Sequence, residues 1–231
     1  MSKQFILGID LGTTNSVLAY TALAGDAADV QLLAIPQLVD EHTVEKRNSL
    51  ASFCLLASEN QPSLSVPWAE NRNFCVGEWA RQQAAEQAER TVSAAKSWLS
   101  YGRVDRRAAI LPWGSPDPIE KISPVVAAQR YLEHLVSAWS VAFPDAPVAE
   151  QEVVLTVPAS FDAVARELTR EAAVAAGLPA DLLLLEEPQA ALYSWLAETG
   201  DQWRNELSVG DRLLVCDVGG GTTDLTLIGI Q

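Results

Sequence analysis

The sequence GIDLGTTNS at residues 8–16 returns in a related form, DVGGGTTD, at residues 217–224. In each copy an apolar run ends in an aspartate, a glycine turn carries two threonines, and a second strand-like run follows. One such turn is common in hairpins and predicts little. Two copies near opposite ends of the chain favour a duplicated architecture in which two glycine turns face each other.

The residue types in the two turns suit a phosphate group. Glycine lets the main chain approach an anion closely, successive N–H groups form an anion-binding nest, and threonine hydroxyls add donors without charge. Asp10 and Asp217 would repel phosphate unless they hold Mg²⁺, directly or through its water molecules. The alternative is that both aspartates only stabilise hairpin turns. Neither GxxxxGKS/T nor GxGxxG occurs, so the sequence predicts neither a P-loop nor a dinucleotide-binding fold.

Composition narrows the class of partner. The 231 residues are 48% apolar and 20% charged, the balance of a globular protein with an ample core, and the net charge is −14. Such acidity argues against binding to nucleic acid or to an anionic membrane surface. Apolar runs are too short for a membrane span and no leader pattern precedes the first strand, so we expect no membrane association.

Three cysteines bear on the cellular compartment. Cys54, Cys75 and Cys216 lack metal-ligand spacing and lie among apolar or aromatic neighbours. We therefore expect all three to be small buried residues, and the protein to work in a reducing, cytoplasmic compartment.

Hydrophobic periodicity predicts the elements along the chain. Strands are expected at residues 4–10, 16–20, 30–36, 152–157 and 182–186, with a final hairpin at 213–218 and 224–230. Helices are expected from Val76 to about Glu89 and at residues 124–143, 163–176 and 190–197, with Gly177 as a C-cap. This alternation favours an α/β sheet, into which the residues from about 40 to 123 are inserted as a subdomain.

Four ordered motifs carry a resemblance to a known family. GIDLGTTNS, VVLTVPASF (153–161), LLLLEEPQAALY (182–193) and DVGGGTTDLT (217–226) resemble the ATPase domain of 70-kDa heat-shock (DnaK-type) chaperones. The likeness extends over residues 5–230 and is weakest in the inserted segment. It implies an α/β, actin-like (ribonuclease H-like) lobe, with a mixed sheet flanked by helices and an inserted α+β subdomain. The first lobe would comprise residues 1–207, and residues 208–231 would begin a second lobe.

The resemblance assigns roles to the two turns. The first phosphate turn would consist of Gly12, Thr13, Thr14 and Asn15, and the second of Gly219, Gly220, Gly221 and Thr222. Asp10 and Asp217 would position Mg²⁺ and its waters. Thr222 would also contact the γ-phosphate.

Outside the turns, the resemblance singles out four residues. Lys96 matches the lysine that gives positive charge to the γ-phosphate and the attacking water, although alone it would read as a surface lysine. Glu187 matches a carboxylate that helps to hold the metal and orient water, the alternative being a plain strand-end acid. Pro158 and Arg166 match a proline switch and its arginine partner, which carry the nucleotide state to a substrate domain. The alternative for Arg166 is an exposed helix residue.

The sequence also departs from the family pattern. Glu186 stands where the family has asparagine, and Gln189 stands where it has threonine. The inserted segment carries LPWG (111–114) and extra tryptophans. These departures indicate a divergent paralogue rather than a housekeeping chaperone.

The resemblance implies an Mg²⁺-dependent ATPase, in which water attacks ATP in line and leaves ADP. Nucleotide state would control how an attached domain, outside this sequence, grips unfolded or extended polypeptide clients, with co-chaperones as further partners. The adenosine pocket would come mainly from the second lobe. We therefore expect this chain alone to bind ATP weakly or not at all, with negligible turnover, and to expose an apolar face that favours self-association.

Three other interpretations remain open. A sugar or acetate kinase of the same fold would transfer phosphate to a small molecule. An actin-like filament or scaffold would polymerise with ATP, and its contacts could use four tryptophans that we otherwise expect in the core: Trp68, Trp79, Trp98 and Trp113. A pseudo-ATPase would keep the fold for interactions only. Against it stands the joint presence of Asp10, Lys96, Glu187, Asp217 and Thr222.

Overall fold

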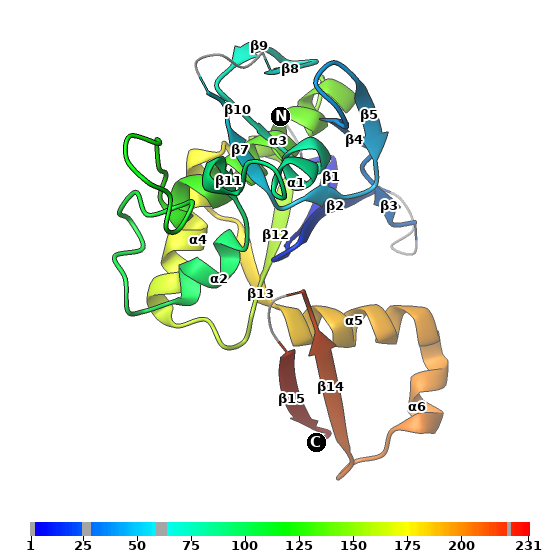
Figure 1. Ribbon diagram of the computed structural model, residues 1–231. Coiled ribbons are helices and arrows are strands. Elements are labelled where there is room, and N and C mark those ends of the chain that lie inside the picture. Colours follow the sequence, from blue (N-terminus) through cyan, green and yellow to red (C-terminus); the bar gives the residue numbers. More distant parts are fainter. Residues whose placement is uncertain (1–2, 25–28, 59–63, 221–222) are drawn as a thin grey trace.

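The computed structural model describes residues 3–24, 29–58, 64–220 and 223–231 (Figure 1). Its strands are β1 (Phe5–Leu11), β2 (Asn15–Ala22), β3 (Gln31–Leu32), β4 (Ile35–Leu38), β5 (Val44–Arg47), β6 (Leu50–Ala51), β7 (Cys54–Leu56), β8 (Leu64–Val66), β9 (Ala69–Arg72), β10 (Phe74–Val76), β11 (Thr91–Val92), β12 (Glu152–Val157), β13 (Leu183–Glu186), β14 (Arg212–Val218) and β15 (Thr223–Gly229). Its α-helices are α1 (Glu78–Gln83), α2 (Ala95–Ser100), α3 (Pro124–Ala142), α4 (Ala163–Ala175), α5 (Glu187–Thr199) and α6 (Trp203–Glu206).

The main sheet is mixed. Its strands run in the order β13-β12-β1-β2-β3, and β6 also pairs with β2. β12 lies parallel to both β1 and β13, whereas β2 is antiparallel to β1. Helices pack against this sheet, which confirms the predicted α/β class and the actin-like arrangement of a mixed sheet flanked by helices.

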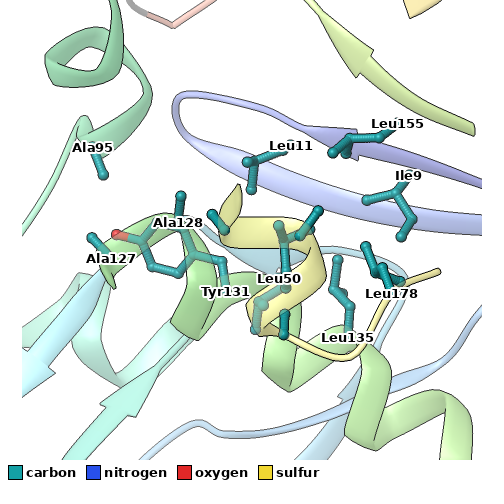
Figure 2. Close-up of a cluster of buried hydrophobic side chains, with 14 of the residues drawn as sticks. Ile9, Leu11, Leu50, Ala95, Ala127, Ala128, Tyr131, Leu135, Leu155 and Leu178 are labelled. Carbon is teal, nitrogen blue, oxygen red and sulfur yellow. The ribbon is translucent and has the colours of Figure 1, made fainter. Parts of the chain in front are cut away.

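One face of the sheet forms the core. Alternate residues of β1 are fully buried, because successive side chains of a strand point to opposite faces. Figure 2 shows Ile9 and Leu11 of β1 with Leu155 of β12, lying opposite Tyr131 and Leu135 of α3. The same alternation places Asp10 on the other face, away from α3, where its side chain is exposed.

Local capping explains where the two long core helices begin and end. The Ser123 hydroxyl accepts a hydrogen bond from the Val126 N–H at the start of α3, and the Asp162 carboxylate accepts one from the Ala165 N–H at the start of α4. Gly177 follows the end of α4 with φ of 95°, a conformation that glycine adopts without strain. The predicted helix boundaries there are confirmed to within a residue.

Asp162 also makes stability depend on pH. Both of its carboxylate oxygens accept hydrogen bonds from Arg106, which hold the pKa of Asp162 at about 2, below its ordinary 3.8. The stabilisation is complete above the ordinary pKa and is lost as the pH falls through the lower one. We expect Asp162→Asn, which keeps a capping side chain, to lower the melting temperature at neutral pH, and this difference to shrink towards pH 2. A difference that stayed constant down to that pH would contradict this account.

Between β3 and α2 the chain builds three small sheets around a second apolar cluster. The sheets pair β4 with β5, β8 with β9, and β7 with both β10 and β11. The strand predicted at 30–36 is divided here between β3 and β4. The helix predicted from Val76 to about Glu89 is wrong in length, because Val76 belongs to β10 and α1 already ends at Gln83. Residues 40 to 123 as an inserted subdomain remain a prediction.

The β14–β15 hairpin packs one face on α5 and leaves the other open (Figure 1). Its exposed large apolar residues are Leu214, Val218, Leu225 and Leu227. Cys216 lies on the same open face, so the expectation that all three cysteines are buried is wrong for this one, although Cys54 and Cys75 are buried. The exposed apolar face itself agrees with the sequence-based expectation.

Two further observations concern the surface. Across the described ranges, none of the helices combines the length and the apolar character that a membrane crossing requires.

Trp113 stacks on Trp98 with ring centroids 4.8 Å apart, yet it remains 62% exposed. The expectation of core packing is therefore wrong for Trp113.

Candidate phosphate-binding site

The carboxyl ends of three parallel strands meet at one edge of the main sheet. Asp10 lies near the end of β1 beside Thr156 of β12, and Val157 pairs with Glu186 at the end of β13. The Thr156 hydroxyl donates to the Asp10 carboxylate at 2.9 Å. Glu187, the first residue of α5, follows directly, so the fold brings two of the predicted acids to the same edge.

The first glycine turn connects β1 to β2 and is held by Ser52. The Ser52 hydroxyl donates to the Gly12 carbonyl at 2.8 Å, and its backbone N–H donates to the Thr14 carbonyl at 2.9 Å. Ser16 and Ser52 also share a hydrogen bond of 3.0 Å in a buried position. Sequence reasoning missed Ser52 and Thr156, because nothing in their neighbourhoods indicates a partner so distant in the chain.

The second turn lies against the first. A Cβ atom placed on Gly220 would come within 2.3 Å of the Thr14 side chain, so the two turns touch where this glycine has no side chain. For Gly220, in the part of the second turn that the structure describes, this contact agrees with the predicted facing of the turns. Gly221 and Thr222 fall outside the described residues, and their proposed roles stay predictions.

Lys96 and Glu187 form an ion pair at the centre of the site. The Lys96 Nζ lies 2.5 Å from the Glu187 Oε1, and their side chains are 11% and 16% exposed. Lys96 is the second residue of α2, and the two residues are 91 positions apart. The reading of Lys96 as a solvated surface lysine is therefore wrong.

The surroundings of Glu187 are unfavourable to a negative charge apart from this lysine. Burial raises the pKa of Glu187, Asp10 and Asp217 raise it further, and the positive charge of Lys96 opposes them. Asp10 of β1 and Asp217 of β14 therefore both lie close enough to Glu187 of α5 to act on its charge.

These residues line one cavity of about 480 Å³. Its lining consists of Asp10, Gly12, Thr13, Thr14, Asn15, Val17, Lys96, Thr156, Glu187, Ala190, Ala191, Asp217, Gly219 and Gly220. The volume lies within the usual range of small-molecule sites, about 300–1,000 Å³. The lining residues are mostly small, several of them carry charged, hydroxyl or amide groups, and none is aromatic, which suits a chain of phosphates better than a nucleobase.

The same cavity fits a hydrated divalent cation. In the part of the chain that the structure describes, no three His, Cys, Asp or Glu residues are grouped tightly enough to hold a metal by themselves. Mg²⁺ usually binds through one or two carboxylates, several waters and phosphate oxygens. Asp10, Glu187 and Asp217, spread around a cavity with two glycine turns, match that donor set.

The proposed switch residues lie beside the site. Pro158 is buried directly after β12. Arg166 of α4 donates to the Phe161 carbonyl at 3.1 Å and to the Glu186 carboxylate at 2.7 Å. It is thus tied to its surroundings rather than free on the helix surface. Glu186, which departs from the family pattern, gives Arg166 an ionic partner next to Glu187.

Gly12 provides a test of the first turn. A Cβ there would lie 2.1 Å from the Asn15 backbone carbonyl, so Gly12→Ala must displace the main chain, whereas a Cβ on Gly8 of β1 meets nothing within 4 Å. In the protein as its gene encodes it, we expect Gly12→Ala to weaken ATP binding by about tenfold or more by misplacing the N–H donors of the turn. Gly8→Ala is the matched control. Equal ATP affinities of the two variants, measured by calorimetry, would contradict this geometry.

Comparison with known proteins bears on this site. The family model described as Hsp70 protein matches residues 121–231. Chaperone protein DnaK of Anaplasma marginale is 31% identical over 240 residues, covering 100% of this chain and 32% of the relative. Chaperone protein HscA of Pectobacterium carotovorum is 30% identical and HscA of Yersinia pseudotuberculosis 32%, each over 99% of this chain. The chain spans about a third of the length of these curated relatives.

The mixed sheet, the paired glycine turns and these matches define the class as an actin-like nucleotide-binding fold. The chain belongs to the Hsp70 family and corresponds to a part of its nucleotide-binding domain. Membership of this family implies nucleotide binding.

Proposed function

We propose that this chain supplies the phosphate-binding face of an Mg²⁺-dependent ATPase that controls a chaperone. The observation that carries the proposal is the single cavity in which the two glycine turns, the Lys96–Glu187 pair and the two aspartates meet. A triphosphate would place its oxygens against backbone N–H groups of both turns. These N–H donors come from turns near opposite ends of the sequence, so the proposed site depends on contact between the two turns.

Each residue has a part in the proposed mechanism. The turns at Gly12–Asn15 and Gly219–Thr222 bind and orient the phosphates, and Lys96 offers a positive charge to the terminal phosphate and to the attacking water. Asp10, Glu187 and Asp217, the last through water, would hold Mg²⁺, which when bound would neutralise charge on the phosphate oxygens. Thr156 orients the Asp10 carboxylate through its hydrogen bond.

The proposal extends to partners. Arg166 forms an ion pair with Glu186, the residue that precedes Glu187, and donates a hydrogen bond to the Phe161 carbonyl. The Phe161 N–H in turn donates to the Pro158 carbonyl, so Arg166 is linked to the turn after β12. A change at Glu187 on ATP binding could therefore move the turn after β12 and be read by another domain. Unfolded or extended polypeptides are the proposed clients of that domain, and co-chaperones are further proposed partners. The division into a lobe at 1–207 and the start of another at 208–231 is part of the same proposal.

The test is a titration of Mg-ATP, followed by calorimetry and by release of inorganic phosphate. It uses this chain and the protein as its gene encodes it. We expect the protein as its gene encodes it to bind ATP and hydrolyse it slowly. We expect this chain alone to show weak or undetectable binding and negligible turnover. ADP production that required an added sugar or acetate would show a kinase instead, and ATP-dependent light scattering would show a filament. Hydrolysis by this chain alone at a rate that depended on Lys96 would overturn the expectation for the short chain.

A further inference from the structure

The Lys96–Glu187 pair differs from every other ion pair within the described ranges. It alone has both side chains less than a fifth exposed, at 11% and 16%. The other pairs each include a partner whose side chain is at least 35% exposed. Solvent screening of Lys96 and Glu187 is correspondingly weak, so each strongly affects any further charge that enters the cavity.

Lys96 already forms an ion pair with the Glu187 carboxylate, which the proposed function assigns as a metal ligand. Its ammonium lies on the Glu187 Oε1 at 2.5 Å, within a cavity that Asp10 and Asp217 also line. A divalent cation at Glu187 would stand only a few ångströms from that ammonium and be repelled by it. Of the other two acids, Asp10 already accepts a hydrogen bond from the Thr156 hydroxyl.

We infer that Lys96 and a divalent cation compete for Glu187, so that Lys96 leaves this carboxylate when a cation binds there and becomes free for the terminal phosphate. The inference rests on the proposed function for the identity of the site. It adds an order of events, since the Lys96 ammonium stays paired with Glu187 until metal and nucleotide bind together. It also predicts that removing the positive side chain tightens metal binding and that most of this effect requires the Glu187 carboxylate.

The test measures binding of Mn²⁺ alone, in place of Mg²⁺ and without nucleotide. Electron paramagnetic resonance counts the free Mn²⁺ ion during a titration of the protein as its gene encodes it. We expect Lys96→Met to lower the Kd for Mn²⁺ by about fivefold or more, because a like charge is removed and a weakly exposed carboxylate is left without a partner. Lys121→Met is the matched control, since it removes a lysine outside this cavity.

A double-mutant cycle locates the competition. Glu187→Gln is expected to weaken Mn²⁺ binding, and in that background Lys96→Met should change the Kd much less than it does in the parent protein. An equal change in both backgrounds would mean that the positive charge of Lys96 acts on the metal without any role for Glu187, which would overturn the competition. An unchanged or higher Kd in the single variant Lys96→Met would overturn the inference.

A second measurement needs no variant. A brief pulse of acetic anhydride, read by mass spectrometry, reports how available each lysine amine is. We expect millimolar Mg²⁺ alone to raise acetylation of Lys96 several-fold relative to Lys121, because the amine loses the negatively charged partner that favours its unreactive ammonium form. An unchanged Lys96 rate at saturating metal would contradict the competition.

The outcomes separate this inference from the proposed function. Tighter Mn²⁺ binding by Lys96→Met, together with a failure of the parent protein to bind ATP, would leave the competition standing and overturn the ATPase proposal. Normal ATP hydrolysis by the parent, with no effect of Lys96→Met on Mn²⁺ affinity, would support the ATPase proposal and overturn the competition.

Discussion

Replacing Lys96 by methionine is expected to lower the rate of ATP hydrolysis by about 10²- to 10³-fold in the protein as its gene encodes it. Methionine keeps much of the length and apolar stem of lysine but removes the charge that would stabilise the terminal phosphate in the transition state. The effect should fall on the rate constant for hydrolysis of bound ATP, measured as phosphate release in a single turnover with protein in excess over ATP.

The control for this experiment is Lys121→Met, which leaves the cavity untouched. We expect it to hydrolyse ATP within about twofold of the parent, because Lys121 is not among the residues that line the cavity. If Lys96→Met retained more than about a tenth of the parent rate, Lys96 could not be the residue that supplies charge to the reacting phosphate.

Replacing Trp139 by alanine is expected to lower the free energy of unfolding by about 3–5 kcal/mol. Trp139 of α3 has no exposed surface, and its ring stacks on Phe143 with centroids 4.1 Å apart. Its indole N–H donates to the Ala146 carbonyl at 2.7 Å, so alanine leaves both a cavity and an unpaired acceptor. Urea unfolding followed by circular dichroism measures the loss.

Trp113 supplies the matched comparison for Trp139. Its ring stacks on Trp98 but is 62% exposed, so Trp113→Ala should cost about 1 kcal/mol or less. Similar losses for the two substitutions would contradict the assignment of one tryptophan to the core and the other to the surface.

Much of the fold could be predicted where the pattern of apolar residues and the end signals agree. β12 begins and ends at the predicted residues, and α3 starts at Pro124 after a serine cap, as the spacing of its apolar residues indicates. Both the periodicity and the cap are local properties, so one sequence suffices to find them.

The errors arise where tertiary contacts outweigh local preference. The residues after Val76 favour a long helix, but pairing of β10 with β7 draws Val76 into a sheet and leaves only a short α1. Cys216 has apolar neighbours, yet it lies on the open face of a two-stranded sheet, and exposure of that kind depends on what covers the sheet rather than on the neighbouring residues.

The sequence named several of the residues that line the candidate cavity, although not Thr156, and it did not predict the contacts between them. Sequence motifs named Lys96 and Glu187 separately, and only the structure places them in direct contact across 91 positions. The contact of Gly220 with Thr14 and the support of the first turn by Ser52 likewise join residues that no local pattern relates. Such contacts depend on how the strand ends converge, which follows from sheet topology.

The most direct test of the account asks whether Lys96 lies at the terminal phosphate of bound ATP. An ATP analogue that carries a reactive acyl group on its γ-phosphate transfers that group to a lysine beside it, and mass spectrometry identifies the lysine. For the protein as its gene encodes it, the account predicts acylation at Lys96 that excess Mg-ATP prevents. Acylation spread over Lys3, Lys46 and Lys121 with no protection by Mg-ATP, and none at Lys96, would contradict it.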